Sequence, residues 1–418
     1  MNQSLSDPRH FRRHALILLV AGLLVQGWLV TRQGILPDQN AVLYSGTQFL
    51  ASDDLPAFAK PSSAGAQLPG FLLPALVAGA ITVWHDYRSP TLFAVIPQVC
   101  AFLLLALVLT RTLETRWAVV YLSLYWLSAW RLFHSASAWE PAFVFLPAAL
   151  HMLLCYRQRD RRHFLESTLL ALVLAVSFQI HASSFILLVS FVWLWVTRRV
   201  KVHWAGLLTG IVVACLFYLP TIQWVLSSPT DTGLPQTHQG VLAGMLSLLK
   251  GTTFWLRMST PDLGERLSQA GGFYGGDQLF MALRVLLGLL VLPSALFTWR
   301  MIRTPDHASP GSSWLRLYSL ACLGSTLVAS LVSPASVQTW HVVIVLHAAL
   351  IPLVLFLRHR GEAGQRGGGA IVVACLILNL GTTCVLGFCH EQYTPPTAAS
   401  LDALNAPQEV RALVGVHP

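Results

Sequence analysis

The chain has 418 residues, of which 55% are hydrophobic and only 11% are charged, and its mean hydropathy is +0.60. A soluble domain carries roughly 25% charged residues, so this composition excludes a soluble multi-domain protein and indicates a polytopic membrane protein. The net charge of +9 does not indicate nucleic-acid binding, because most Lys and Arg residues lie in short clusters between apolar runs, as in cytoplasmic loops.

A basic N-terminus, which includes Arg9, Arg12 and Arg13, precedes the first apolar run, ALILLVAGLLVQGWLV. No small-residue cleavage site follows and further apolar runs do, so we interpret this run as a retained helix and not as a signal peptide. A span needs about 20 apolar residues and must satisfy its own backbone in lipid, which predicts helices. The predicted spans, about 11 in number, lie near 14–31, 91–110, 117–133, 141–156, 165–180, 183–197, 204–222, 278–298, 314–333, 340–357 and 369–388.

Basic clusters at 156–166, 197–203 and 358–366 indicate the cytoplasmic side, together with the N-terminus. The C-terminal tail is then outside. We divide the chain into a transmembrane module at 1–222 that includes a long outer loop at 32–90, an outer loop at 223–277, C-terminal transmembrane helices at 278–388 and an outer tail at 389–418.

The first outer loop contains two segments that are predicted to be helical. The first, QNAVLYSGTQFLA, has apolar residues at roughly helical spacing and could lie along the membrane surface. The second, at 71–84, is apolar but short and contains Pro and Gly, which favours a re-entrant or interfacial helix over a span.

Polar residues gather on the predicted outer side. Asp38 follows Pro37 and precedes a helical segment, so it is equally well interpreted as a helix N-cap or as a catalytic base. Glu140 precedes Pro141 at a helix start, where a carboxylate also interacts favourably with the helix dipole. The other polar or aromatic residues expected there are Lys60, Gln179, His181, Lys250, Arg257, Arg266, Trp340 and His341.

Each of these residues also has a purely structural interpretation. His181 could hydrogen-bond a helix turn, and His341 could be interfacial. Trp340 is at a position typical of an aromatic belt, and Arg257 could bind phospholipid headgroups in general. Cations with two acids around an outer cavity would suit an anionic lipid headgroup and a proton transfer.

Five segments occur in an order that is informative. They are LPDQNAVLYSGTQFLASDDLP, AGAQLPGFLLPALVAGAITVW, YRSPTLFAVIPQV, SAWEPAFVFLPAAL and QIHASSF. This series resembles the GT-C superfamily of membrane glycosyltransferases, in particular its protein O-mannosyltransferase and aminoarabinose-transferase branch, most strongly over about 30–200. Asp38 matches the first acid of the family's Asp-Glu motif and Glu140 matches its second acidic position.

Two positions depart from the family pattern. Gln39 replaces the Glu of the usual Asp-Glu pair. Gln67-Leu68-Pro69 replaces a Lys-Pro-Pro signature, and Lys60 lies a few residues too early to substitute for its Lys.

The resemblance implies a GT-C-like bundle with interfacial helices in the first loop, in a bacterial inner membrane, with the N-terminus cytoplasmic and the active site on the periplasmic face. It implies a polyprenyl-phosphate-linked sugar as donor, inversion, and Asp38 as the base that deprotonates an acceptor hydroxyl. Glu140 would hold the acceptor, or a divalent cation together with Asp38. The acceptor would be a glycan, a lipid or a protein, and the partners would be membrane lipids and not nucleic acid. The residues assigned to substrate or donor binding are Lys60, Gln67, Tyr44, Gln179, His181, Arg257, Trp340 and His341.

Two alternatives to this enzyme are left open by the sequence. A lipid or sugar transporter would place ionisable residues at mid-depth on broken helices, and the predicted spans carry few of them. A catalytically inactive scaffold with the same fold is kept open by Gln39.

Overall fold

The computed structural model describes residues 8–61, 67–227, 241–264, 266–267, 277–304, 309–333, 336–364 and 367–416. Within these ranges the regular structure is helical except for a short antiparallel hairpin, β1 (Phe58–Pro61) and β2 (Gln67–Pro69). The predicted class, an all-helical polytopic membrane protein, is confirmed.

Six helical segments of the described chain are long and apolar enough to cross a membrane. They are α1 (Pro8–Thr31), α4 (Ser89–Thr112), α14 with α15 (Asp277–Gly288 and Val291–Arg303), α16 (Pro310–Val332), the stretch from α17 to α19 (Thr339–Glu362) and α20 (Gly368–Cys389).

Two more spans are counted if each of two bent helix pairs crosses as one. One pair is α6 (Ala129–Ser135) with η2 and α7 (Glu140–Phe143 and Phe145–Arg157), bent by 112°, and the other is α10 (Trp204–Phe217) with α11 (Leu219–Ser227), bent by 65°. The shorter apolar helices are α3 (Leu72–Val83), α8 (Phe164–Ile180) and α9 (Phe185–Val196) with η3 (Ala182–Ser184) before it. Length and composition alone therefore support six to eight spans, whereas the sequence prediction of about 11 also counted short helices.

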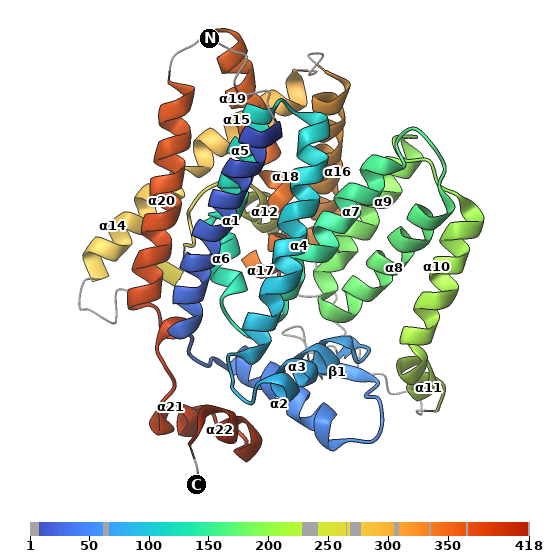
Figure 1. Ribbon diagram of the computed structural model, residues 1–418, viewed down its shortest axis with the longest axis vertical. Coiled ribbons are helices and arrows are strands. Elements are labelled where there is room, and N and C mark those ends of the chain that lie inside the picture. The colour runs from blue at the N-terminus through green and yellow to red at the C-terminus, as the bar shows by residue number, and fades with distance from the viewer. Residues whose placement is uncertain are drawn as a thin grey trace.

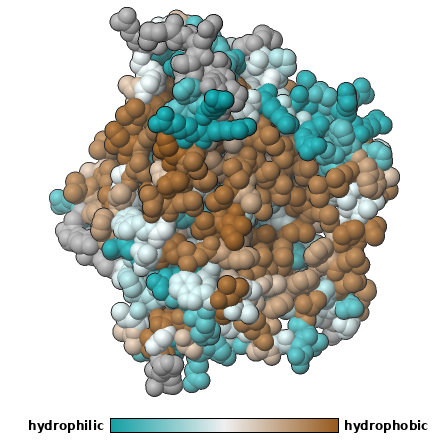
Figure 2. Space-filling view, viewed as in Figure 1, coloured by the Kyte–Doolittle hydropathy of each residue, from teal (hydrophilic) through white to brown (hydrophobic). Residues whose placement is uncertain are grey.

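The bundle has an apolar belt between two polar ends, as Figure 2 shows. At one end α2 (Pro37–Ala51) and α3 lie across the bundle, together with the C-terminal helices α21 (Ala398–Ala403) and α22 (Gln408–Val414), as seen in Figure 1. We call this the α2–α3 end. The tail is held there by a hydrogen bond from Tyr87 N to Leu413 O at 3.3 Å. α1 begins at the opposite end, whereas the first loop and the tail share one end, as predicted.

The span predicted at 117–133 is broken in the structure. α5 (Thr115–Trp126) ends before α6 begins, and the break frees the Trp126 carbonyl and the Ala129 N–H. Arg131 Nε donates to the Trp126 carbonyl at 2.7 Å, and Ala129 N donates to Asn379 Oδ1 at 2.8 Å. Backbone groups freed inside an apolar bundle need new partners, and these two side chains provide them.

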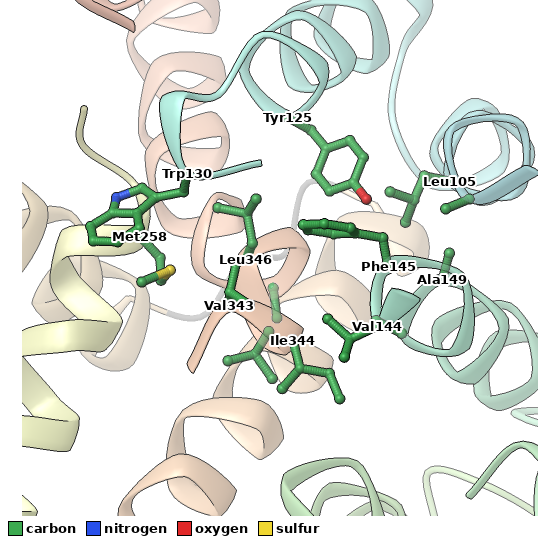
Figure 3. Close-up of a cluster of buried hydrophobic side chains, with 14 of the residues drawn as sticks. Leu105, Tyr125, Trp130, Val144, Phe145, Ala149, Met258, Val343, Ile344 and Leu346 are labelled. Carbon is green, nitrogen blue, oxygen red and sulfur yellow. The ribbon is translucent and has the colours of Figure 1, made fainter. Parts of the chain in front are cut away.

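The segment 223–277, which was expected to be an outer loop, contains a helix that packs into the bundle. α12 (Val241–Met258) lies against α16, and its Trp255 and Met258 are each only 1% exposed. Figure 3 shows Met258 beside Trp130, facing Val343 and Leu346 of the broken stretch before α19 (Ile351–Glu362). This segment is rich in small and polar residues, so the apolar face of α12 was not recognised in the sequence.

A methyl group should be tolerated at one glycine of α1 and rejected at another. A Cβ at Gly22 would overlap the indole of Trp126, whereas nothing lies within 4 Å of a Cβ at Gly27. Overpacking costs about 1–3 kcal/mol, while Gly to Ala in an unobstructed helix adds roughly 0.5–1 kcal/mol. We expect Gly22→Ala to lower and Gly27→Ala to maintain or raise the thermal unfolding midpoint in detergent. Equal midpoints for both variants would contradict this packing of α1 on α5.

Candidate functional site

Asp38 lies in the first turn of α2 and is not the N-cap of that helix. The N-cap is Leu36, Pro37 follows it, and the Asp38 side chain is exposed. The carboxylate has no hydrogen bond or ion pair with the residues that the structure describes. The N-cap interpretation of Asp38 is therefore wrong, because the helix begins two residues earlier than that interpretation requires. Its position still favours a negative charge, since backbone N–H groups at a helix start create a positive potential.

Gln39, the residue that departs from the family pattern, has a structural role. It is the third residue of α2, it is buried, and its Oε1 accepts a hydrogen bond from Leu36 N at 2.9 Å. This is the contact that Gln or Glu makes in a capping box. The Gln in place of Glu therefore occupies a buried position that caps the helix. The neighbouring Asp38 is exposed in its presence.

Glu140 lies in the tight connection between α6 and α7. It begins η2 after Trp139 and is 5% exposed. Two buried amides hold this connection: Gln26 Nε2 donates to Ser135 O at 3.2 Å and Gln98 Nε2 donates to Ala142 O at 3.0 Å.

Asp38 and Glu140 lie at the same end of the bundle. Gly34 N, shortly before Asp38, donates to Gln392 O at 2.6 Å. Gln392 Nε2 donates in turn to Phe133 O at 3.2 Å, close to the end of α6. The start of α2 and the connection that carries Glu140 are therefore joined through the 390–393 segment.

The structure brings four of the predicted binding residues into one row of side chains, which we call the aromatic row. Successive members are ring neighbours, with centroids 5.5–6.1 Å apart, and the row ends on a guanidinium 5.5 Å from the last ring. One member, Trp139, directly precedes Glu140. In order, the row is His181, His341, Trp340, Trp139, His134, Trp130 and Arg257.

Two members of the row have contacts that restrict their freedom. The His181 ring accepts a hydrogen bond from Ser183 N at 3.1 Å, which is the helix-turn role considered from the sequence. Arg257 forms an ion pair with Asp262 at 2.8 Å and is 14% exposed. Both side chains are thus positioned by the protein itself, at the edge of the row.

Other predicted residues lie elsewhere at this end. Gln179 packs against Gly70, which has φ +93°, and donates to Phe217 O at 2.8 Å. Tyr44 is 38% exposed on α2. The side chains of Lys60 and Gln67 are outside the described set, although their backbones form β1 and β2.

Buried polar atoms without a hydrogen-bond partner among the described residues concentrate at the α2–α3 end. An unsatisfied buried group costs about 1–3 kcal/mol, and such groups often mark sites for water, ions or ligands. Apart from Gln179, sequence analysis did not single these residues out, because burial of a Gln, Ser or His has no sequence signal. Those at this end are Gln33, Asn40, Ser89, Thr91, His134, Ser137 and Gln179, while Arg131 and Trp314 lie elsewhere.

Metal binding by Asp38 and Glu140 was considered from the sequence. Among the described residues, no group of three or more His, Cys, Asp or Glu side chains is placed to hold a metal ion. Two carboxylates are too few for a protein-only cage, although Mg²⁺ often keeps several waters. The donor set therefore does not define a metal centre.

The chain was compared with known proteins. No protein-family model and no curated protein matches it. Among solved structures it is similar to ArnT from Cupriavidus metallidurans bound to undecaprenyl phosphate, with 14% identity, a TM-score of 0.49, and coverage of 96% of this chain and 77% of that one. For ArnT of the same organism in the apo state the identity is 15%, with the same TM-score and coverage. The composition and described helices of this chain define an integral membrane protein.

The capping role of Gln39 predicts different thermal stabilities for two substitutions of this residue. Gln39→Glu keeps the acceptor for Leu36 N and should retain the thermal midpoint of the wild type. Gln39→Ala removes it, and loss of a cap contact costs about 0.5–2 kcal/mol. The measurement is thermal unfolding of both variants in the same detergent. A wild-type midpoint for Gln39→Ala would show that the contact does not stabilise α2.

The burial of His390 predicts that the free energy of unfolding decreases at acidic pH. Its ring accepts a hydrogen bond from Gln392 N at 3.0 Å, and burial together with the nearby Arg266 cation lowers its pKa from 6.5 to about 3. The unfolded chain therefore takes up a proton as the pH falls through 6.5, whereas the folded protein does not.

The contribution of His390 to the free energy of unfolding should then decrease by about 1.6 kcal/mol between pH 6.5 and 5, with a slope that approaches about 1.4 kcal/mol per pH unit. His390→Asn retains an acceptor for Gln392 N and should show a shallower decrease. His85→Asn, at an exposed histidine of the same end, is the control and should follow the wild type. Identical slopes for His390→Asn and the wild type would contradict the prediction.

Proposed function

We propose that this protein is an integral-membrane glycosyltransferase that moves a sugar from a polyprenyl-phosphate donor to an acceptor hydroxyl, with Asp38 as general base. The observation that carries the proposal is an exposed carboxylate on the first turn of α2, at the end where unpartnered buried polar atoms concentrate. The ordered GT-C-like motifs of the sequence support the same assignment.

In the proposed reaction the acceptor oxygen attacks the anomeric carbon while its proton moves to the Asp38 carboxylate. The bond between that carbon and the phosphate oxygen breaks, polyprenyl phosphate leaves, and the anomeric configuration inverts. A positioned base contributes about 10²- to 10⁴-fold to such a step. Glu140, buried in its tight connection, would orient the acceptor hydroxyl by accepting a hydrogen bond.

Charge that develops on the leaving phosphate needs cations near it. Arg266 supports this role, because its guanidinium lies 5.8 Å from the Phe133 ring and 5.9 Å from the Trp340 ring. Arg257 closes the other part of the aromatic row, and Lys60 would contribute from β1. Most rings of the row are buried, but Trp340 and His341 are partly exposed and offer flat surfaces of the kind on which a sugar stacks. The site would face the periplasm of a bacterial inner membrane.

One observation favours the transporter alternative. The helices of the bundle carry more buried ionisable residues than the sequence suggested. His151 Nδ1 lies 2.9 Å from Tyr318 Oη, which lies 2.9 Å from His347 Nε2. All three side chains are at most 2% exposed, however. A transport path would require such groups to face water, so we favour a structural role for them.

The inactive-scaffold alternative depended on Gln39. Because that residue caps α2 from a buried position, its difference from Glu does not remove an acid from the exposed face. Asp38 remains available for proton transfer.

The test is a matched pair of substitutions in the first loop. Asp38→Asn should reduce sugar transfer by about 10²- to 10⁴-fold, whereas Asp54→Asn, an exposed acid of the same loop, should retain it. Transfer is measured as label incorporated in membranes supplied with polyprenyl-phosphate-linked sugars, with expression and thermal midpoint checked for each variant. A folded Asp38→Asn protein with wild-type transfer would refute Asp38 as the base.

A further inference from the structure

A second site lies at the end of the bundle opposite α2 and α3, where α9 is followed by α10. A pocket of about 430 Å³ opens there. Figure 2 shows hydrophilic atoms at this corner, above the apolar belt, where Figure 1 places the loops that join α7 to α8 and α9 to α10. The pocket is lined by Arg162, Arg198, Lys201, Trp195, Trp204 and two valines.

All charged residues that line this pocket are positive. Three cations line it and no carboxylate does. The two acids that flank Arg162 in sequence form ion pairs with other arginines. Asp160 pairs with Arg159 at 2.9 Å, and Glu166 pairs with Arg157 at 2.8 Å. The pocket is therefore complementary to an anion.

Arg198 reaches the pocket at a conformational cost. Its φ is +59°, in the left-handed region that disfavours residues with a side chain, and this costs roughly 1–2 kcal/mol. The turn is held by hydrogen bonds from Arg198 N to Trp195 O at 2.9 Å and from Arg199 N to Leu194 O at 2.8 Å. A left-handed residue commonly ends a helix in this way, and the turn places Arg198 and Lys201 on the same pocket.

The pocket adjoins surface that is suited to lipid. Trp195 and Trp204 pack edge to face with ring centroids 5.3 Å apart, and they are 37% and 53% exposed. Tryptophan pairs at the end of an apolar helix face are typical of the membrane interface. Below them, α10 exposes Leu208 and Val212 to 58% and 65%.

We propose that this pocket binds one anionic phospholipid, with its headgroup phosphate between Arg162, Arg198 and Lys201. The acyl chains would lie along the exposed apolar face of α10, below the two tryptophans. Basic pockets between membrane helices bind lipid headgroups in this way. The site is separate from the proposed sugar-transfer site, at the other end of the bundle.

The experiment is native mass spectrometry of the full-length protein in detergent, with phosphatidylglycerol or phosphatidylcholine added. We expect phosphatidylglycerol to be retained at least tenfold more than phosphatidylcholine by the wild type. Arg162→Gln with Arg198→Gln should lose this preference. Arg161→Gln with Arg199→Gln removes the same charge from adjacent exposed residues that do not line the pocket and should keep it. Equal retention by the two double variants would overturn the site.

A second variant separates binding from folding. Arg198→Gly relieves the strained backbone, so it should be at least as stable as the wild type and still lose most of the bound phosphatidylglycerol. Wild-type retention by this variant would overturn the role of Arg198. Excess inorganic phosphate should not displace the lipid. Displacement by phosphate alone would instead identify a soluble phosphate compound as the ligand and overturn the lipid assignment.

Discussion

A buried hydrogen-bonded cluster of Gln26, Gln98 and Arg131 holds the broken segment between α5 and α7 in place. Arg131 Nη1 donates to the side-chain oxygens of Gln26 and Gln98, at 3.0 and 3.3 Å. Its guanidinium lies 3.7 Å from the centre of the Trp126 ring. The cluster joins α1, α4 and α6. A buried charge is costly unless it is well solvated by the protein, so this arginine stabilises the broken helix geometry that provides its acceptors. The connection that carries Glu140 follows from that break.

The two ends of the bundle differ in chemistry. At the α2–α3 end polar side chains are buried among rings, and several have no partner among the described residues. At the opposite end cations such as Arg162 and Arg198 are exposed and surround a pocket without carboxylates. Buried, partly unsatisfied groups suit a site that excludes water and orients a reaction, whereas exposed cations beside tryptophans suit a lipid headgroup. The molecule thus separates proposed chemistry from proposed lipid contact.

Much of the architecture could be predicted from the apolar runs, including α1, α4, α16 and α20, since a lipid-spanning run must form a helix. The interfacial helices of the first loop and the shared location of that loop and the tail were also predicted. The break in 117–133 and the burial of α12 were not, because both depend on partners distant in sequence, such as Asn379 for Ala129. The sequence likewise identified Asp38 and Glu140 as candidates but could not indicate His134 or Gln33.

The sequence by itself determined that this is a helical membrane protein, which side of each run is basic, and which acids follow the first and third predicted spans. Composition and charge order are properties of neighbouring residues, so they can be read without the fold. Only the tertiary structure decided that Gln39 caps α2, that Leu36 and not Asp38 is the N-cap, and that rings from three separate parts of the chain form one row. The row depends on packing between residues distant in sequence, which the order of residues does not show. The cap depends on the residue at which α2 begins, and neighbouring residues allowed more than one start.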